Sequence, residues 1–137
     1  TARVIPSQLQ SGFGRLGTWF GHQYYDFEPD LAPIAKGLSS GYLPIGGVLV
    51  SDRVAEVMVN ELGDFYHGYT YSGHPVACAA GIAAIDIYEK EGLFNKAIEL
   101  GSYWEEALHG LRDLPNIADI RNYGLIGAIE LELHAGH

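Results

Sequence analysis

Two short apolar runs in the first third of the chain predict buried β-strands. Leu31 to Ala35 is apolar throughout and ends at Lys36, and Ile45 to Ser51 is rich in valine. Uninterrupted apolar runs of this length are typical of strands that are covered on both faces. The glycine- and serine-containing residues 37–43 between them predict a connecting loop.

Three later segments carry the pattern of helices. Ser51 and Asp52 favour a helix N-terminus, and the helix that they begin has its apolar residues on one face. Residues 76–90 are rich in alanine and predict a helix that can pack closely against a neighbour, with Ser72 as a candidate cap. Residues 93–111 carry apolar side chains at helical spacing.

The C-terminal part of the chain predicts two further strands, at residues 117–120 and 127–133. Within the second, residues 129–133 alternate apolar and polar side chains strictly, as a strand with one solvated face does. A soft boundary near Glu91 and Gly92 separates a glycine-rich α/β portion from a helix followed by strands. The whole pattern indicates an α/β fold.

The chain is acidic and carries few cations. Eight Lys and Arg stand against 17 Asp and Glu among 137 residues, so the formal net charge is −9. This charge argues against nucleic acid or an anionic membrane as a partner, because such partners require a basic face. No apolar run approaches the roughly 20 residues of a membrane-spanning helix. The single cysteine, Cys78, and a start without a secretory signal lead us to expect a cytoplasmic location.

Lys36 is the first candidate for chemistry. It stands between an apolar strand and a glycine-containing loop. A lysine at such a strand end loses part of its hydration, which favours the neutral, nucleophilic amine that a Schiff base requires. A surface lysine whose alkyl chain lies along apolar residues would have the same sequence context. The local sequence leaves both interpretations open.

Two further segments suggest anion binding, each weakly. Thr70 and Ser72 lie just before the predicted helix at 76–90, where backbone N–H groups favour a phosphate, but an ordinary cap among packed tyrosines has the same pattern. The glycine-rich run 10–17 matches neither the P-loop nor the dinucleotide-binding fingerprint, and a turn with one surface arginine would account for it. The six histidines and the one cysteine show no metal-ligand spacing, so we expect no metal site.

Three segments taken together resemble the class-III aminotransferases, which use pyridoxal 5'-phosphate. They are residues 10–15 (QSGFGR), residues 29–47 with the sequence AKGL at 35–38, and residues 67–75 (HGYTYSGHP). Residues 74–81 and 119–125 are most similar to the omega-amino-acid:pyruvate branch of that family.

The resemblance extends over nearly the whole chain and implies its architecture. It implies a fold-type-I transferase with a mostly parallel central sheet. Residues 1–91 would then form part of the large, cofactor-binding domain. Residues 92–137 would form the linking helix and the start of the small C-terminal domain.

Position by position, the resemblance assigns roles to four residues. Lys36 matches the catalytic lysine that forms a Schiff base with the cofactor and then moves a proton as general base and acid. Thr70 matches the threonine that contacts the cofactor phosphate from the neighbouring subunit. Leu9 falls where a branched apolar residue lies against the pyridine ring, and Gln10 falls where members often have a glutamine near the ring hydroxyl.

The implied reaction moves an amino group from an omega-amino acid or another amine donor to a 2-oxo acid such as pyruvate, in a homodimer or a higher oligomer. The chain departs from the family at Ser7 and Gln8, where members carry an Asp-Glu pair. The aspartate pairs with the protonated ring nitrogen, and a neutral serine does not stabilise that charge comparably. Members are also much longer than this chain, so we expect the chain by itself to turn over slowly or not at all.

Two alternatives to amino transfer stay open at this point. The chain could be a non-catalytic domain that retains the fold, which the residues at positions 7 and 8 favour. It could also be another pyridoxal-phosphate enzyme of the same fold type, such as an aminomutase or a racemase, because the lysine chemistry is shared.

Overall fold

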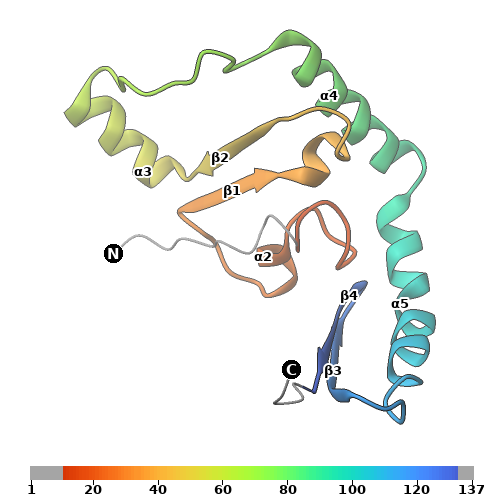
Figure 1. The fold of residues 1–137 in the computed structure, drawn as a ribbon. Helices are drawn as coiled ribbons and strands as arrows, with labels where there is room; N and C mark the ends of the chain where they lie inside the picture. The colour runs from red at the N-terminus through yellow and green to blue at the C-terminus, as the bar shows by residue number, and fades with distance from the viewer. Residues whose placement is uncertain (1–10, 133–137) are drawn as a thin grey trace, which may run out of the picture.

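The computed structural model describes residues 11–132, which form two antiparallel hairpins connected through two long helices (Figure 1). No helix in this range is long and apolar enough to cross a membrane. The elements in chain order are α2 (Gly21–Tyr24), β1 (Leu31–Ala35), the 3-10 turn η1 (Lys36–Ser39), β2 (Gly46–Val50), α3 (Asp52–Val57), the π-helical turn η2 (Met58–Leu62), α4 (Pro75–Lys90), α5 (Leu93–His109), β3 (Ile117–Tyr123) and β4 (Ile126–Leu131).

The first hairpin consists of β1 and β2, which confirms both strands expected in this part of the chain. They pair antiparallel, with Leu31 opposite Val50 and Ala35 opposite Gly46. The mostly parallel sheet implied by the resemblance is not found within residues 11–132, where both strand pairs are antiparallel. The reason is local, because ten residues join β1 to β2 and a parallel pair requires a crossover of a dozen or more.

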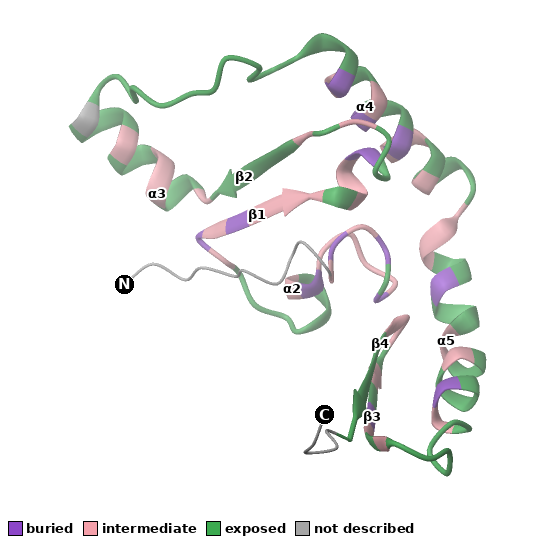
Figure 2. Cartoon of the chain, viewed as in Figure 1, coloured by how far each residue is buried: buried purple, intermediate pink, exposed green. Residues whose placement is uncertain are grey.

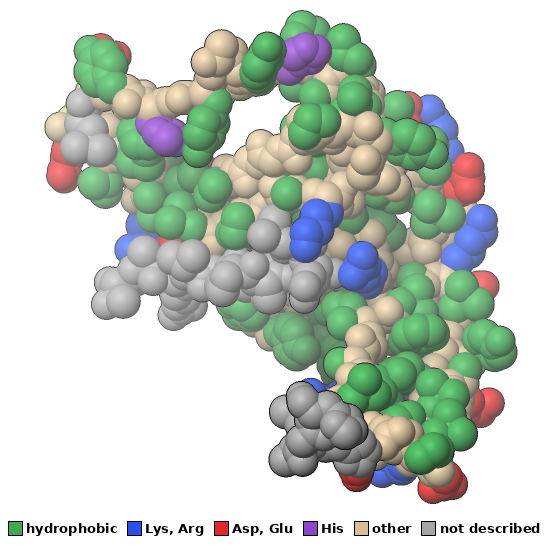
Figure 3. All heavy atoms as spheres, in the orientation of Figure 1, with side chains coloured by type: hydrophobic (Ala, Val, Ile, Leu, Met, Phe, Trp, Pro, Cys, Tyr) green, Lys and Arg blue, Asp and Glu red, His purple; other side chains and the backbone are tan. Residues whose placement is uncertain are grey.

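The expectation that β2 is buried is wrong for the described part of the chain. All five of its residues are exposed (Figure 2). Large apolar side chains are exposed in many parts of the described chain, and several lie on the face that Figure 3 shows.

Helix α4 packs closely against η1, as its small side chains predict. Ala77, Gly81 and Ala84 are the buried residues of this helix. A Cβ at Gly81 would lie 3.4 Å from the carbonyl oxygen of Leu38, so the helix backbone approaches the turn directly. The expected cap at Ser72 is wrong: the helix begins at Pro75, and the Ser72 hydroxyl instead accepts the backbone N–H of Tyr69.

Helix α5 leads to the second hairpin. It buries Ala97 and Leu108, whereas the neighbouring Ile98 is 62% exposed. Strands β3 and β4 are joined by a two-residue turn at Gly124 and Leu125. This turn reaches back to the start of the described chain, because the Leu125 N–H donates a 3.0 Å hydrogen bond to the carbonyl oxygen of Arg15.

An aromatic cluster joins these parts of the chain. The Tyr88 ring of α4 lies 6.2 Å from Phe13, 6.3 Å from Trp19 and 6.1 Å from Phe94 of α5, measured between ring centroids. Trp19 and Phe94 meet edge to face at 4.6 Å. Such pairs contribute about 0.5–1.5 kcal/mol beyond their buried area. The cluster therefore fixes α4 and α5 against the turn at residues 13–19.

Candidate active site

Lys36 begins η1, directly after β1. Its backbone has φ +53°, in the left-handed region that residues with a side chain rarely adopt. Two backbone hydrogen bonds close the turn, from the Ser40 N–H to the Gly37 carbonyl and from the Gly41 N–H to the Lys36 carbonyl. Ser39 is 2% exposed, and its hydroxyl donates to the carbonyl oxygen of Leu43. The strand end and the turn therefore hold the Lys36 backbone in a strained conformation.

A cavity of about 330 Å³ opens beside this turn. It is lined by Gly12, Phe13, Arg15, Lys36, Gly37, Ser40, Gly41 and Tyr88. Among residues 11–132, five non-glycine residues have positive φ, and three of them, Phe13, Lys36 and Ser40, line this one cavity. Backbone strain of this kind concentrates at functional sites, so the geometry singles out the Lys36 cavity.

The charges of the cavity favour an anionic ligand. Arg15 and Lys36 are both exposed, and within residues 11–132 no acidic side chain lines the cavity. Of the two interpretations that the sequence left open for Lys36, the structure favours the surface lysine, because the residue is exposed. The volume lies at the lower end of the range for small-molecule sites. With the Arg15 guanidinium and the Lys36 amine in its lining, the cavity fits a small phosphate-bearing cofactor.

Thr70 lies elsewhere in the chain. It is exposed in the segment that joins η2 to α4, and it lines none of the three cavities found in the described residues. Figure 1 shows this segment (yellow-green) running past the hairpin on the side of α3 and α4. One chain therefore does not bring Thr70 and Lys36 together. Leu9 and Gln10, and the departures at Ser7 and Gln8, lie outside the described residues.

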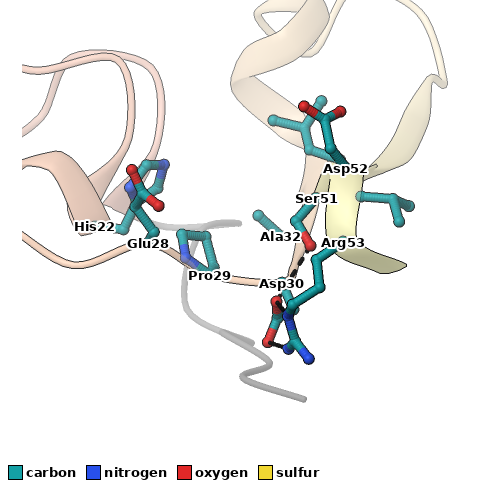
Figure 4. A pocket seen from close by; sticks show the side chains of 10 residues that line it. His22, Glu28, Pro29, Asp30, Ala32, Ser51, Asp52 and Arg53 are labelled. Carbon is teal, nitrogen blue, oxygen red and sulfur yellow. Dashed lines mark hydrogen bonds and ion pairs between the residues drawn. The ribbon is translucent and has the colours of Figure 1, made fainter. Parts of the chain in front are cut away.

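A larger cavity, of about 820 Å³, lies at the other end of the β1–β2 hairpin (Figure 4). The main polar contact among its lining residues joins two elements of the fold. Asp30, which is 8% exposed, accepts hydrogen bonds from Arg53 Nη2 at 2.6 Å, Arg53 Nε at 3.2 Å and the Ser51 hydroxyl at 3.1 Å. This carboxylate, by hydrogen bonding first and by its charge second, raises the pKa of Arg53. The group ties the start of β1 to the start of α3.

Sequence reasoning missed two residues of the Lys36 cavity, Arg15 and Tyr88. Arg15 has the sequence context of a surface arginine in a glycine-rich turn. Tyr88 carries a usable signal, because it follows the small buried residues Ala77, Gly81 and Ala84 at helical spacing and so lies on the face of α4 that meets η1. No group of three or more potential metal-ligating side chains occurs in the part of the chain that the structure describes.

Comparison with known proteins gives a consistent result. The family model "Aminotransferase class-III" matches residues 3–136. The chain is 48% identical over 128 residues to a putrescine–pyruvate aminotransferase of Pseudomonas aeruginosa, and 44% identical over 133 residues to an omega-amino acid–pyruvate aminotransferase of Pseudomonas putida. These alignments each cover 93% of this chain but only 28% and 30% of the relatives, so the chain spans under a third of their length.

The fold is also that of solved transaminases. An (S)-enantioselective omega-transaminase from Thermomicrobium roseum matches 91% of this chain, and the chain covers 28% of that structure, with a TM-score of 0.84 and 43% identity. The α/β, fold-type-I architecture expected from the sequence is therefore confirmed, for part of such a fold. The chain belongs to the class-III aminotransferases, a family of pyridoxal-phosphate enzymes.

Proposed function

We propose that the protein transfers an amino group from an omega-amino acid or another amine to a 2-oxo acid such as pyruvate, with pyridoxal phosphate bound in the Lys36 cavity. The observation that carries the proposal is the strained turn that places Lys36 in a small cavity with a second cation and no acidic side chain. The named substrates of the relatives, putrescine or an omega-amino acid with pyruvate, support the donor and acceptor classes.

The chemistry of Lys36 and of Arg15 supports a role for each of them in the cavity. When bound, pyridoxal phosphate supplies an aldehyde that condenses with an amine and a ring that draws electrons from the carbon of that amine. Lys36 carries the only side-chain amine among the lining residues that the structure describes, so its Nζ is the group that would hold the cofactor covalently. Once a substrate amine has displaced it, the free Lys36 amine is placed to take up a proton and return it. The Arg15 guanidinium is available to bind a phosphate or a carboxylate.

Assembly is part of the proposal. A homodimer or a higher oligomer would allow Thr70 to approach the Lys36 cavity of a neighbouring subunit, where the resemblance puts the phosphate-binding threonine. The exposure of Thr70 and its absence from the Lys36 cavity of its own chain support this arrangement. The cytoplasmic location expected from the single cysteine stays a prediction.

The decisive experiment traps the cofactor on the lysine. Purified protein is titrated with pyridoxal phosphate by visible absorbance, reduced with borohydride and digested for peptide mapping. We expect the reduced cofactor on Lys36, lost in Lys36→Ala and retained in the matched control Lys96→Ala, whose side chain is exposed on α5. A folded protein that carries no cofactor on Lys36 would refute the proposal.

A non-catalytic domain is the second candidate. Two observations favour it: Ser7 and Gln8 replace the family's acidic pair, and the chain spans under a third of its relatives. Turnover separates the two candidates, with putrescine or β-alanine as donor and pyruvate as acceptor. Alanine formation supports amino transfer, whereas cofactor on Lys36 without alanine formation supports the non-catalytic domain.

A further inference from the structure

A single hydrogen bond connects α4 to the residue after Lys36. The Tyr88 hydroxyl donates to the carbonyl oxygen of Gly37 at 2.6 Å, across 51 positions of sequence. Tyr88 also lines the Lys36 cavity with its side chain. Since its ring is half-buried, this bond is partly shielded from water.

The turn that receives this bond needs support from outside. Lys36 at φ +53° and Ser40 at φ +52° both lie in the left-handed region, and η1 itself is only four residues long. Such backbone persists only where the surrounding structure determines it. The Gly37 carbonyl accepts two hydrogen bonds, from the Ser40 N–H within the turn and from the Tyr88 hydroxyl outside it. The second bond therefore holds the peptide group between Gly37 and Leu38, one peptide beyond the bond that joins Lys36 to Gly37.

The position of the Tyr88 hydroxyl is itself well determined. The ring contacts Phe13, Trp19 and Phe94, which come from two different parts of the chain. Phe13 also lies against Gly37 from the side, so closely that a Cβ at Gly37 would lie 2.8 Å from its ring. The Gly37 peptide is thus held between an aromatic ring and a phenolic hydroxyl.

We propose that Tyr88 is a positioning residue, which holds the Gly37 peptide and thereby sets where the Lys36 amine lies in the cavity. The inference rests on the proposed function of Lys36 as the cofactor-binding lysine. The ring of Tyr88 packs the aromatic cluster, and its hydroxyl orients the turn. The two contributions are separable, because phenylalanine keeps the ring and removes only the hydroxyl.

The test compares Tyr88→Phe with Tyr103→Phe, which removes the hydroxyl of an exposed tyrosine on α5. The first readout requires no cofactor. Amide hydrogen exchange at Ser40 and Gly41, whose N–H groups close the turn, should be about five-fold faster in Tyr88→Phe, the effect of losing one hydrogen bond of ordinary strength. Tyr103→Phe should exchange like the parent protein, and melting followed by circular dichroism should confirm that all three are folded.

The second readout is the loading of Lys36. In Tyr88→Phe we expect pyridoxal phosphate to bind with about five-fold weaker affinity, as measured by the amount that borohydride traps on Lys36. We also expect the pH dependence of this trapping to differ from that of the parent protein. A role in packing alone would lower the melting temperature without moving that pH dependence. Equal exchange, affinity and pH dependence in Tyr88→Phe and Tyr103→Phe would overturn the inference while leaving the proposed function intact. A parent protein that loads no cofactor on Lys36 would overturn both.

Discussion

We expect a single added methyl group, at Gly124, to break the contact between the C-terminal hairpin and the turn at residues 13–17. Gly124 has φ +52°, and a Cβ added there would lie 2.6 Å from the carbonyl oxygen of Arg15 and 3.0 Å from Leu16 Cδ2. The Arg15 carbonyl cannot yield easily, because it also accepts the Leu125 N–H at 3.0 Å. Gly124→Ala should therefore displace the hairpin from the turn.

The magnitude follows from three contributions. An alanine in the left-handed region costs about 1–2 kcal/mol, offset by about 0.4–1 kcal/mol from the reduced entropy of the unfolded chain. Overpacking against the Arg15 carbonyl adds about 1–3 kcal/mol. Gly124→Ala should then lower the free energy of unfolding by about 1–5 kcal/mol. Gly92 provides the matched control, since it has φ +60° and nothing in the described part of the chain lies within 4 Å of the place that a Cβ would take.

Urea denaturation followed by circular dichroism measures both variants against the parent protein. Gly92→Ala reports the backbone strain alone, so we expect it to cost about 1 kcal/mol or less. The difference between the variants reports the contact with Arg15. Equal destabilisation by the two substitutions would refute the close approach of the hairpin to this turn.

Two further predictions concern charge. Hydrogen bonding with Tyr24 first, and desolvation second, raise the pKa of Tyr123 to about 12. This pKa is above the value of 10.0 for an unperturbed tyrosine. The stability that the protonated Tyr123 contributes is therefore present below pH 10 and is lost as the pH rises towards 12. Absorbance titration of Tyr24→Phe should show the Tyr123 midpoint move towards 10, and an unchanged midpoint would contradict the assigned cause. Arg15→Gln should weaken pyridoxal phosphate binding about ten-fold, because a charged hydrogen bond to an anion is lost. Arg112→Gln, which changes an arginine outside the Lys36 cavity, should bind like the parent, and equal affinities in the two variants would exclude Arg15 from the site.

The elements of the fold were largely predictable because they depend on local pattern. The apolar run Leu31–Ala35 forms β1 as expected, and the alanine-rich and amphipathic segments form α4 and α5 within two residues of the expected ends. What the pattern could not predict was burial. The apolar run of β2 is exposed, since burial depends on what lies over a strand and not on the strand itself. The choice of Ser72 as a cap was wrong for a local reason. Its hydroxyl accepts the backbone N–H of Tyr69 in the turn that precedes the helix.

The candidate site was predictable in part. Local sequence made Lys36 a candidate but left two interpretations open, and the resemblance to the family favoured the catalytic one. The structure adds the strained backbone and the cavity, which local context could not show. The role of Thr70 depends on a second subunit, and those of Leu9 and Gln10 on residues that the structure does not describe, so these three stay predictions. Arg15, Tyr88 and Phe13 come together at the cavity through tertiary contacts. Such contacts are only weakly indicated by the local sequence.

The turn at residues 13–17 connects the Lys36 cavity to the residues after Gly92. None of them lines the Lys36 cavity in the part of the chain that the structure describes. Several of them nevertheless contact this turn. The Leu125 N–H donates a hydrogen bond to the carbonyl of Arg15, and Phe94 lies where a Cβ at Gly14 would stand. The side chain of Arg15 lines the cavity from the same residue. We therefore expect a shift of the hairpin or of α5 to move Arg15, a cation of the cavity, without direct contact with Lys36.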